Sequence, residues 1–267
     1  MISLSIFKKS FQIVSTYNQL LFLILFFSGA LTLTLIISIT TYFVLESLLI
    51  LPVVLFILSF TVTFFNISTP FFIGSKIQKK NPSTIQCLRF AWRKKKTIFT
   101  HSILRILLFP LKIVETVFSP LGRIGSLFVR PFEFILGSVW QFSSALTPAT
   151  VVFGKAKGIY SFRKTVLDTR RARGRKIRLK NMFWFEWIVY IVQAAFFIWL
   201  LILTVNMNAL LFTFICLLMI IVVSVTYSLF TVCKSSWFFA LYIFLVLNKV
   251  LPPFSKNLLL RSATQRV

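Results

Sequence analysis

The residues best suited to chemistry form a polar stripe on one apolar stretch of the chain. His101, Arg105, Lys112 and Glu115 follow one another at intervals of four, seven and three residues within a predicted helix over residues 98-117. At about 100° per residue, these four side chains fall within an arc of roughly 80° on the helix surface. Ionisable groups inside a bilayer are costly, so they face the protein interior or water and seek partners. The spacing therefore predicts a polar pathway or an anion site.

A second predicted helix, over residues 127-153, supplies partners for this stripe. Arg130 is a suitable partner for Glu115, and Glu133 is one for either cation. The candidate polar stripe comprises His101, Arg105, Lys112, Glu115, Arg130 and Glu133. Two other interpretations stay open. Either the helix over 98-117 lies along the membrane interface with its cations reaching lipid phosphates, or the charges form a buried structural ion pair.

Signatures of catalysis and of metal binding are scarce. The only aspartate is Asp168 and the only histidine is His101, which excludes an aspartate dyad and a site with several histidines. The three cysteines, Cys87, Cys216 and Cys233, are odd in number and include no CxxC pair, so neither a disulfide framework nor a zinc site is indicated. There is no Gly-rich phosphate loop and no G-x-S-x-G sequence. These absences predict a protein that is not an enzyme and holds no cofactor.

The composition indicates an integral membrane protein. Of the 267 residues, 58% are hydrophobic and only 13% are charged, against about 25% charged residues in soluble domains. A membrane helix needs about 20 mainly apolar residues. The expected fold is all-α, a single polytopic membrane domain over 1-267 with about six transmembrane helices at approximately 20-42, 48-73, 98-117, 127-153, 183-205 and 210-231.

The charge distribution predicts the orientation of these helices. There are 30 Lys and Arg residues against 5 Asp and Glu, a net charge of +25. Most of the cations gather in two loops, over 76-97 and 155-181, and cytoplasmic loops carry such an excess. We therefore expect both termini in the cytoplasm and the protein in the bacterial cytoplasmic (inner) membrane. The tail over 234-267 is expected to be amphipathic, and its apolar part either extends the sixth helix beyond Lys234 or lies in the interface.

The two basic loops are the candidate contacts with anionic lipid headgroups. Within 76-97, Ile85, Leu88 and Trp92 recur at helical spacing on one face, which predicts an amphipathic helix on the membrane surface. The candidate lipid or partner contacts are Arg89, Arg93, Lys94, Lys95, Lys96, Arg170, Arg171, Arg173, Arg175, Lys176, Arg178 and Lys180. Other membrane proteins or an acidic partner are the alternative, and nucleic acid is the weakest hypothesis.

The order of features along the whole chain resembles a family of uncharacterised, mostly prokaryotic polytopic membrane proteins that is defined as a domain of unknown function. The matching segments are "TFFNISTPFFIGS", "IQCLRFAWRKKKTIF", "GRIGSLF", "GSVWQFSSALTPATVVF", "SFRKTVL" and "FFALYIFLVLNKVLPPFSKNLLLRSA". The chain departs from the family in the basicity of "RRARGRK" and in "TPATVVFGKAKG", where an acidic residue is usual. Because the family has no assigned activity, the resemblance implies a fold and transfers no functional residue.

Two functions follow as hypotheses. The leading one is a non-enzymatic membrane component, structural or membrane-organising, whose basic loops rest on anionic lipid or an acidic partner. The rival is a transporter or channel that moves an anion or a lipid headgroup along the polar stripe.

Overall fold

The computed structural model describes residues 2–45, 50–104, 106, 146–152, 184–204 and 209–259. Six long helices organise these residues: α1 (Ile2–Thr16), α2 (Asn18–Leu45), α3 (Ile50–Ile77), α4 (Thr84–Arg93), α9 (Trp184–Thr204) and α10 (Ala209–Leu247). Shorter helical segments cover 95–104, 146–152 and 256–259, and the described residues contain no strand. The expected all-α fold is confirmed for this part of the chain.

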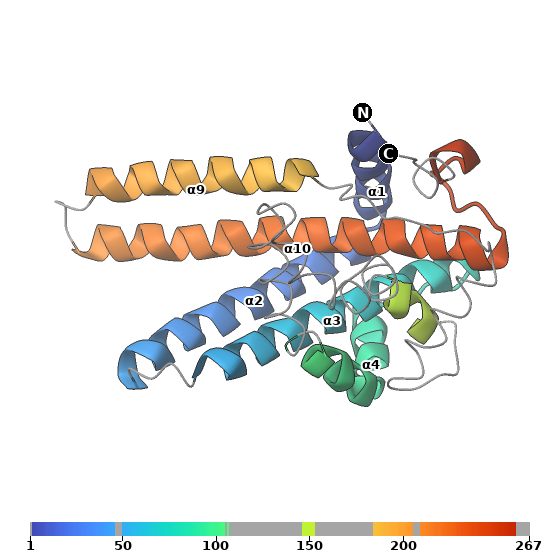
Figure 1. The fold of residues 1–267 in the computed structure, drawn as a ribbon. Helices are drawn as coiled ribbons and strands as arrows, with labels where there is room; N and C mark the ends of the chain where they lie inside the picture. Colours follow the sequence, from blue (N-terminus) through green and yellow to red (C-terminus); the bar gives the residue numbers. More distant parts are fainter. Residues whose placement is uncertain are drawn as a thin grey trace, which may run out of the picture.

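The helices form two antiparallel hairpins, α2 with α3 and α9 with α10, which reach toward the same side of the molecule (Figure 1). Three helical segments are long and apolar enough to cross a membrane: Asn18–Thr41, Pro52–Ile77 and Leu211–Leu247. A shorter apolar helix runs over Ile188–Thr204. These segments are those of a membrane-embedded protein.

The chain before the first expected span is itself a helix. α1 ends at Thr16, and Tyr17 interrupts the helical hydrogen bonds before α2 begins at Asn18. One face of α1 is buried, with Ile6, Ile13 and Val14 almost inaccessible. Packing against α10 and α2 therefore orders a segment that hydropathy did not identify as a separate helix.

The expected span 210-231 lies within α10, which continues through Lys234 to Leu247. Of the two alternatives for the apolar part of the tail, the structure shows the one that extends the sixth helix. The 39 residues of α10 make it about 58 Å long, nearly twice the roughly 30 Å hydrocarbon core of a bilayer. From Trp237 to Leu245 almost every side chain is buried against α1, α2 and α3. The segment 234–247 thus lies at the centre of a helical core, and it contains no glycine or proline to end the helix.

Burial divides the long helices into two halves. The compact half contains the buried residues of α2 between Leu20 and Phe27 and those of α3 between Phe65 and Ile73. Large apolar side chains are exposed toward the tips of the hairpins, among them Leu33, Ile37, Val53, Ile57, Ile202, Phe214 and Leu218. They are also exposed on the outer faces of α2 and α9 further from the tips, as at Phe22, Phe26 and Ile191. An exposed apolar surface of this extent needs lipid as its solvent.

α4 is amphipathic, as expected, and it packs against α3 through small side chains. Ile85 and Trp92 are 65% and 57% exposed, whereas Cys87 and Ala91 are fully buried. These two small side chains bring α4 close to α3, where the Phe90 ring stacks on Phe71 at 4.0 Å. Close packing against α3 therefore uses the small side chains and leaves Ile85 and Trp92, two residues of the predicted apolar face, exposed on the outside of the protein.

Local hydrogen bonds define where α4 begins. The Ser83 hydroxyl accepts a hydrogen bond from the Gln86 backbone N–H at 3.2 Å, and the Gln86 side chain accepts one from the Ser83 N–H at 3.0 Å. This reciprocal capping box satisfies two N–H groups that a helix start leaves without partners. The sequence "STIQ" thus starts the helix that positions the basic residues.

Candidate functional site

A continuous basic surface covers α4 and the helical segment that follows it. Arg89, Arg93, Lys95 and Lys96 are exposed, and Lys94 is half-buried. We call these five residues the basic surface. Because Ile85 and Trp92 are exposed on the same helix, cations and large apolar side chains are presented together. Such a mixture is typical of helices that lie at a membrane interface.

The charge of the basic surface is not neutralised by the described part of the chain. Among the described residues the only carboxylate is that of Glu186, which lies on α9 and forms an ion pair with Lys234 of α10. The basic surface therefore presents several positive charges to whatever lies against it.

Aromatic rings hold two cations of the basic surface close to the protein. The Lys94 Nζ lies 5.7 Å from the centre of the Phe90 ring, and the Lys95 Nζ lies 5.4 Å from that of Trp92. Contacts of this kind are worth about 0.5–1 kcal/mol at exposed sites. They restrict the lysine side chains while leaving the ammonium groups able to bind an anion.

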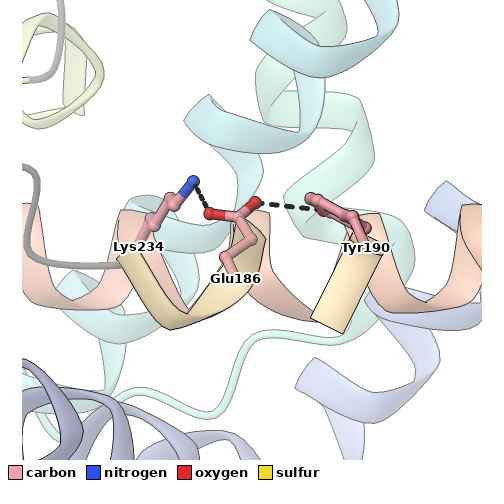
Figure 2. Close-up of polar contacts among 3 residues, drawn as sticks. All are labelled: Glu186, Tyr190 and Lys234. Atoms are coloured by element: carbon pink, nitrogen blue, oxygen red, sulfur yellow. Dashed lines mark hydrogen bonds and ion pairs between the residues drawn. The ribbon is translucent and has the colours of Figure 1, made fainter. Parts of the chain in front are cut away.

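The second polar feature is a cluster between α9 and α10. The Glu186 carboxylate lies between Lys234, its ion-pair partner, and Tyr190, whose hydroxyl donates a hydrogen bond to it at 3.0 Å (Figure 2). Further along the same two helices, the Gln193 Nε2 donates to the Thr226 Oγ1 at 2.8 Å. These contacts fix the register of the two helices against each other.

The ion pair marks one end of the apolar surface. Glu186 is the third residue of α9, which ends at Thr204. The intervening turns are about 27 Å long, close to the thickness of a hydrocarbon core. Next to Lys234, the Ser235 hydroxyl donates a hydrogen bond to the Asn66 side chain of α3. Lys234 therefore pairs within its own hairpin, and Ser235 next to it joins the two hairpins where the compact half begins.

Most of the predicted polar stripe lies outside the described residues. His101 alone is described, and its side chain is buried in the helical segment 95–104. Arg105, Lys112, Glu115, Arg130 and Glu133 fall outside, as do the cations of the second basic loop, Arg170, Arg171, Arg173, Arg175, Lys176, Arg178 and Lys180. The polar pathway therefore stays a prediction.

Sequence patterns did not predict the cluster of Glu186, Tyr190 and Lys234. A carboxylate at the start of one apolar helix and a lysine within another were visible signals in a chain with only 5 acidic residues. Their pairing depends on the register of α9 against α10, which the sequence does not show. Within the described ranges, no group of three or more His, Cys, Asp or Glu side chains is placed to hold a metal ion.

No protein-family model, curated protein or solved structure matches the chain significantly. The resemblance to a family of uncharacterised polytopic membrane proteins thus stays a prediction. Within the described ranges, the architecture is an all-α fold with three helices long and apolar enough to span a membrane, and the basic helix α4 packs against one of them.

Proposed function

We propose that the protein is a non-enzymatic, multi-pass membrane protein that organises anionic lipid at the cytoplasmic face of a bacterial inner membrane. The observation that carries this proposal is the basic surface, which is exposed next to large apolar side chains and has no carboxylate within the described residues to pair with. Each Lys or Arg near an anionic membrane surface contributes about 1 kcal/mol of attraction.

The distribution of charge supports the proposed orientation. Among the described residues, Lys and Arg occur on α1, at the end of α3, on and after α4, and in the last part of α10 and beyond it. These segments belong to the half of the molecule away from the hairpin tips (Figure 1). By the positive-inside rule this half faces the cytoplasm. Six spans with both termini inside are the topology that we propose.

Lipid selectivity tests this function. The protein is reconstituted in phosphatidylcholine vesicles with trace spin-labelled phosphatidylglycerol or phosphatidylcholine, and electron paramagnetic resonance measures the motionally restricted fraction of each. We expect phosphatidylglycerol to be restricted several-fold more strongly at low salt, with the preference falling as salt rises. Equal restriction of the two lipids at low salt would contradict the proposal.

A matched pair of variants assigns the selectivity to the basic surface. The variant R89Q/R93Q/K95Q/K96Q removes four of its charges and should abolish most of the preference. The control K79Q/K80Q/K249Q/K256Q removes the same charge from exposed positions elsewhere and should retain it. An equal loss in both variants would mean that net charge, and not this surface, attracts the lipid.

A further inference from the structure

An open groove lies beside the basic surface, where the segment 95–104 packs against α3. It has a volume of about 420 Å³ and is lined by Phe60, Trp92, Lys95, Lys96, Phe99 and Thr100. Its size falls in the range of small-molecule sites, roughly 300–1,000 Å³. The groove combines three aromatic rings with two ammonium groups.

Contacts within the protein hold the walls of this groove in place. Phe99 is half exposed, yet its ring packs edge-on against Phe56 of α3 at 5.2 Å. The Lys95 ammonium lies over the Trp92 ring. The Thr100 hydroxyl donates to the Lys96 carbonyl at 3.0 Å, so it is already used within the helix. The groups left to bind a polar ligand are therefore the two ammonium groups and the indole N–H of Trp92, all of them donors, and they suit an anion.

The apolar walls of the groove indicate which kind of molecule the anionic group belongs to. Phe60 belongs to the apolar segment Pro52–Ile77 of α3, on which Val53 and Ile57 are also exposed toward the hairpin tip. Ile103, one helical turn beyond Phe99, is exposed as well. The groove thus continues into the apolar surface of both helices. A hydrocarbon chain can follow that surface, whereas a free phosphate or a nucleotide makes no use of it.

We infer that this groove binds one anionic phospholipid, with its phosphate between Lys95 and Lys96 and an acyl chain against Phe60 and Phe99. The inference rests on the proposed function and deepens it. The proposed function needs only a general electrostatic attraction between the basic surface and anionic lipids, whereas this site binds one lipid molecule per chain. Trp92 lies at the level of the glycerol backbone, where tryptophan is enriched in membrane proteins.

Native mass spectrometry of the detergent-solubilised full chain tests the site. Phosphatidylglycerol and phosphatidylcholine are titrated separately, and the bound lipids per chain are counted. We expect one phosphatidylglycerol to be retained, with at least about tenfold higher affinity than phosphatidylcholine, and K95Q/K96Q to remove that difference. K79Q/K80Q, which neutralises two exposed lysines outside the groove, should bind as the wild type does.

Three outcomes would overturn the site. The first is equal binding by K95Q/K96Q and the wild type, and the second is several weakly bound lipids without a distinct first one. The third is binding of sn-glycerol 3-phosphate, or of a single-stranded RNA oligonucleotide, as tightly as the lipid. In each of these cases the spin-label preference for phosphatidylglycerol can persist, so the groove fails while the proposed function stands. Loss of that preference in the wild type would overturn the proposed function itself.

Discussion

Removing Lys234 should destabilise the protein more than neutralising Glu186, although the two residues form a single ion pair. The Glu186 side chain is 8% exposed and that of Lys234 is 33% exposed. K234M leaves a buried carboxylate without its cation, whereas E186Q leaves a lysine that still reaches solvent. Breaking a fully buried pair costs about 3–5 kcal/mol and breaking an exposed one about 0–1 kcal/mol. We therefore expect a loss of about 3 kcal/mol for K234M and about 1 kcal/mol for E186Q.

The double variant E186Q/K234M measures the interaction energy between Glu186 and Lys234 separately from the contacts that each side chain makes with other residues. E186Q keeps a side-chain oxygen that accepts the hydrogen bond from Tyr190, so that contact survives the loss of charge. E186Q/K234M contains no stranded carboxylate and should be about as stable as E186Q alone. The resulting coupling energy is about 2–3 kcal/mol. The free energy of unfolding is measured by titrating the protein in mixed micelles with sodium dodecyl sulfate.

A lysine that is exposed and has no carboxylate beside it among the described residues provides the control for K234M. K249M removes an exposed lysine just beyond α10 and should change the free energy of unfolding by less than about 0.5 kcal/mol. Equal losses for K234M and E186Q, or losses that simply add in the double variant, would refute the argument that burial of Glu186 sets the cost.

Three further predictions concern α3 and α4. S83A removes half of the capping box with Gln86 and should lower the free energy of unfolding by about 1 kcal/mol, and no loss in the same titration would contradict that role. Lys79 has a backbone φ of 59°, in the left-handed region. K79G should therefore stabilise the protein by about 1 kcal/mol, and a destabilised variant would show that the lysine side chain matters more. Burial raises the pKa of the Cys87 thiol to about 12, so below that pH the thiol stays protonated and unreactive. Maleimide labelling of Cys87, followed by peptide mass spectrometry, should stay slow from roughly pH 7 to 10 and become fast only on unfolding, whereas labelling of the folded protein that rises near the ordinary thiol pKa would contradict its burial.

Hydropathy located much of the helical framework. The expected spans 20-42, 48-73 and 183-205 lie close to α2 (Asn18–Leu45), α3 (Ile50–Ile77) and α9 (Trp184–Thr204). The helices were located because a long, mainly apolar run satisfies its backbone polar groups in an apolar environment only as a helix, whatever lies beside it.

Hydropathy left open what packing decides. Because Lys234 interrupts the apolar run, the sequence allowed the sixth helix either to end or to continue, and α10 continues because Glu186 pairs with that lysine and three helices enclose the next turns. Spacing alone also did not show that Cys87 and Ala91 of α4 pack inside the protein while Ile85 and Trp92 stay exposed. In both cases the deciding contact comes from a segment distant in the sequence.

The sequence by itself determined the apolar composition, the helical class and the excess of positive charge, because each is a sum over residues or over a short window. It also showed that very few acids are present to balance those cations. Among the described residues, only the tertiary structure decided which cation pairs with a carboxylate and which remain exposed. That choice depends on the register of α9 against α10, which gives Lys234 its carboxylate, and on the close contact of α4 with α3, which turns the basic surface and Trp92 outward.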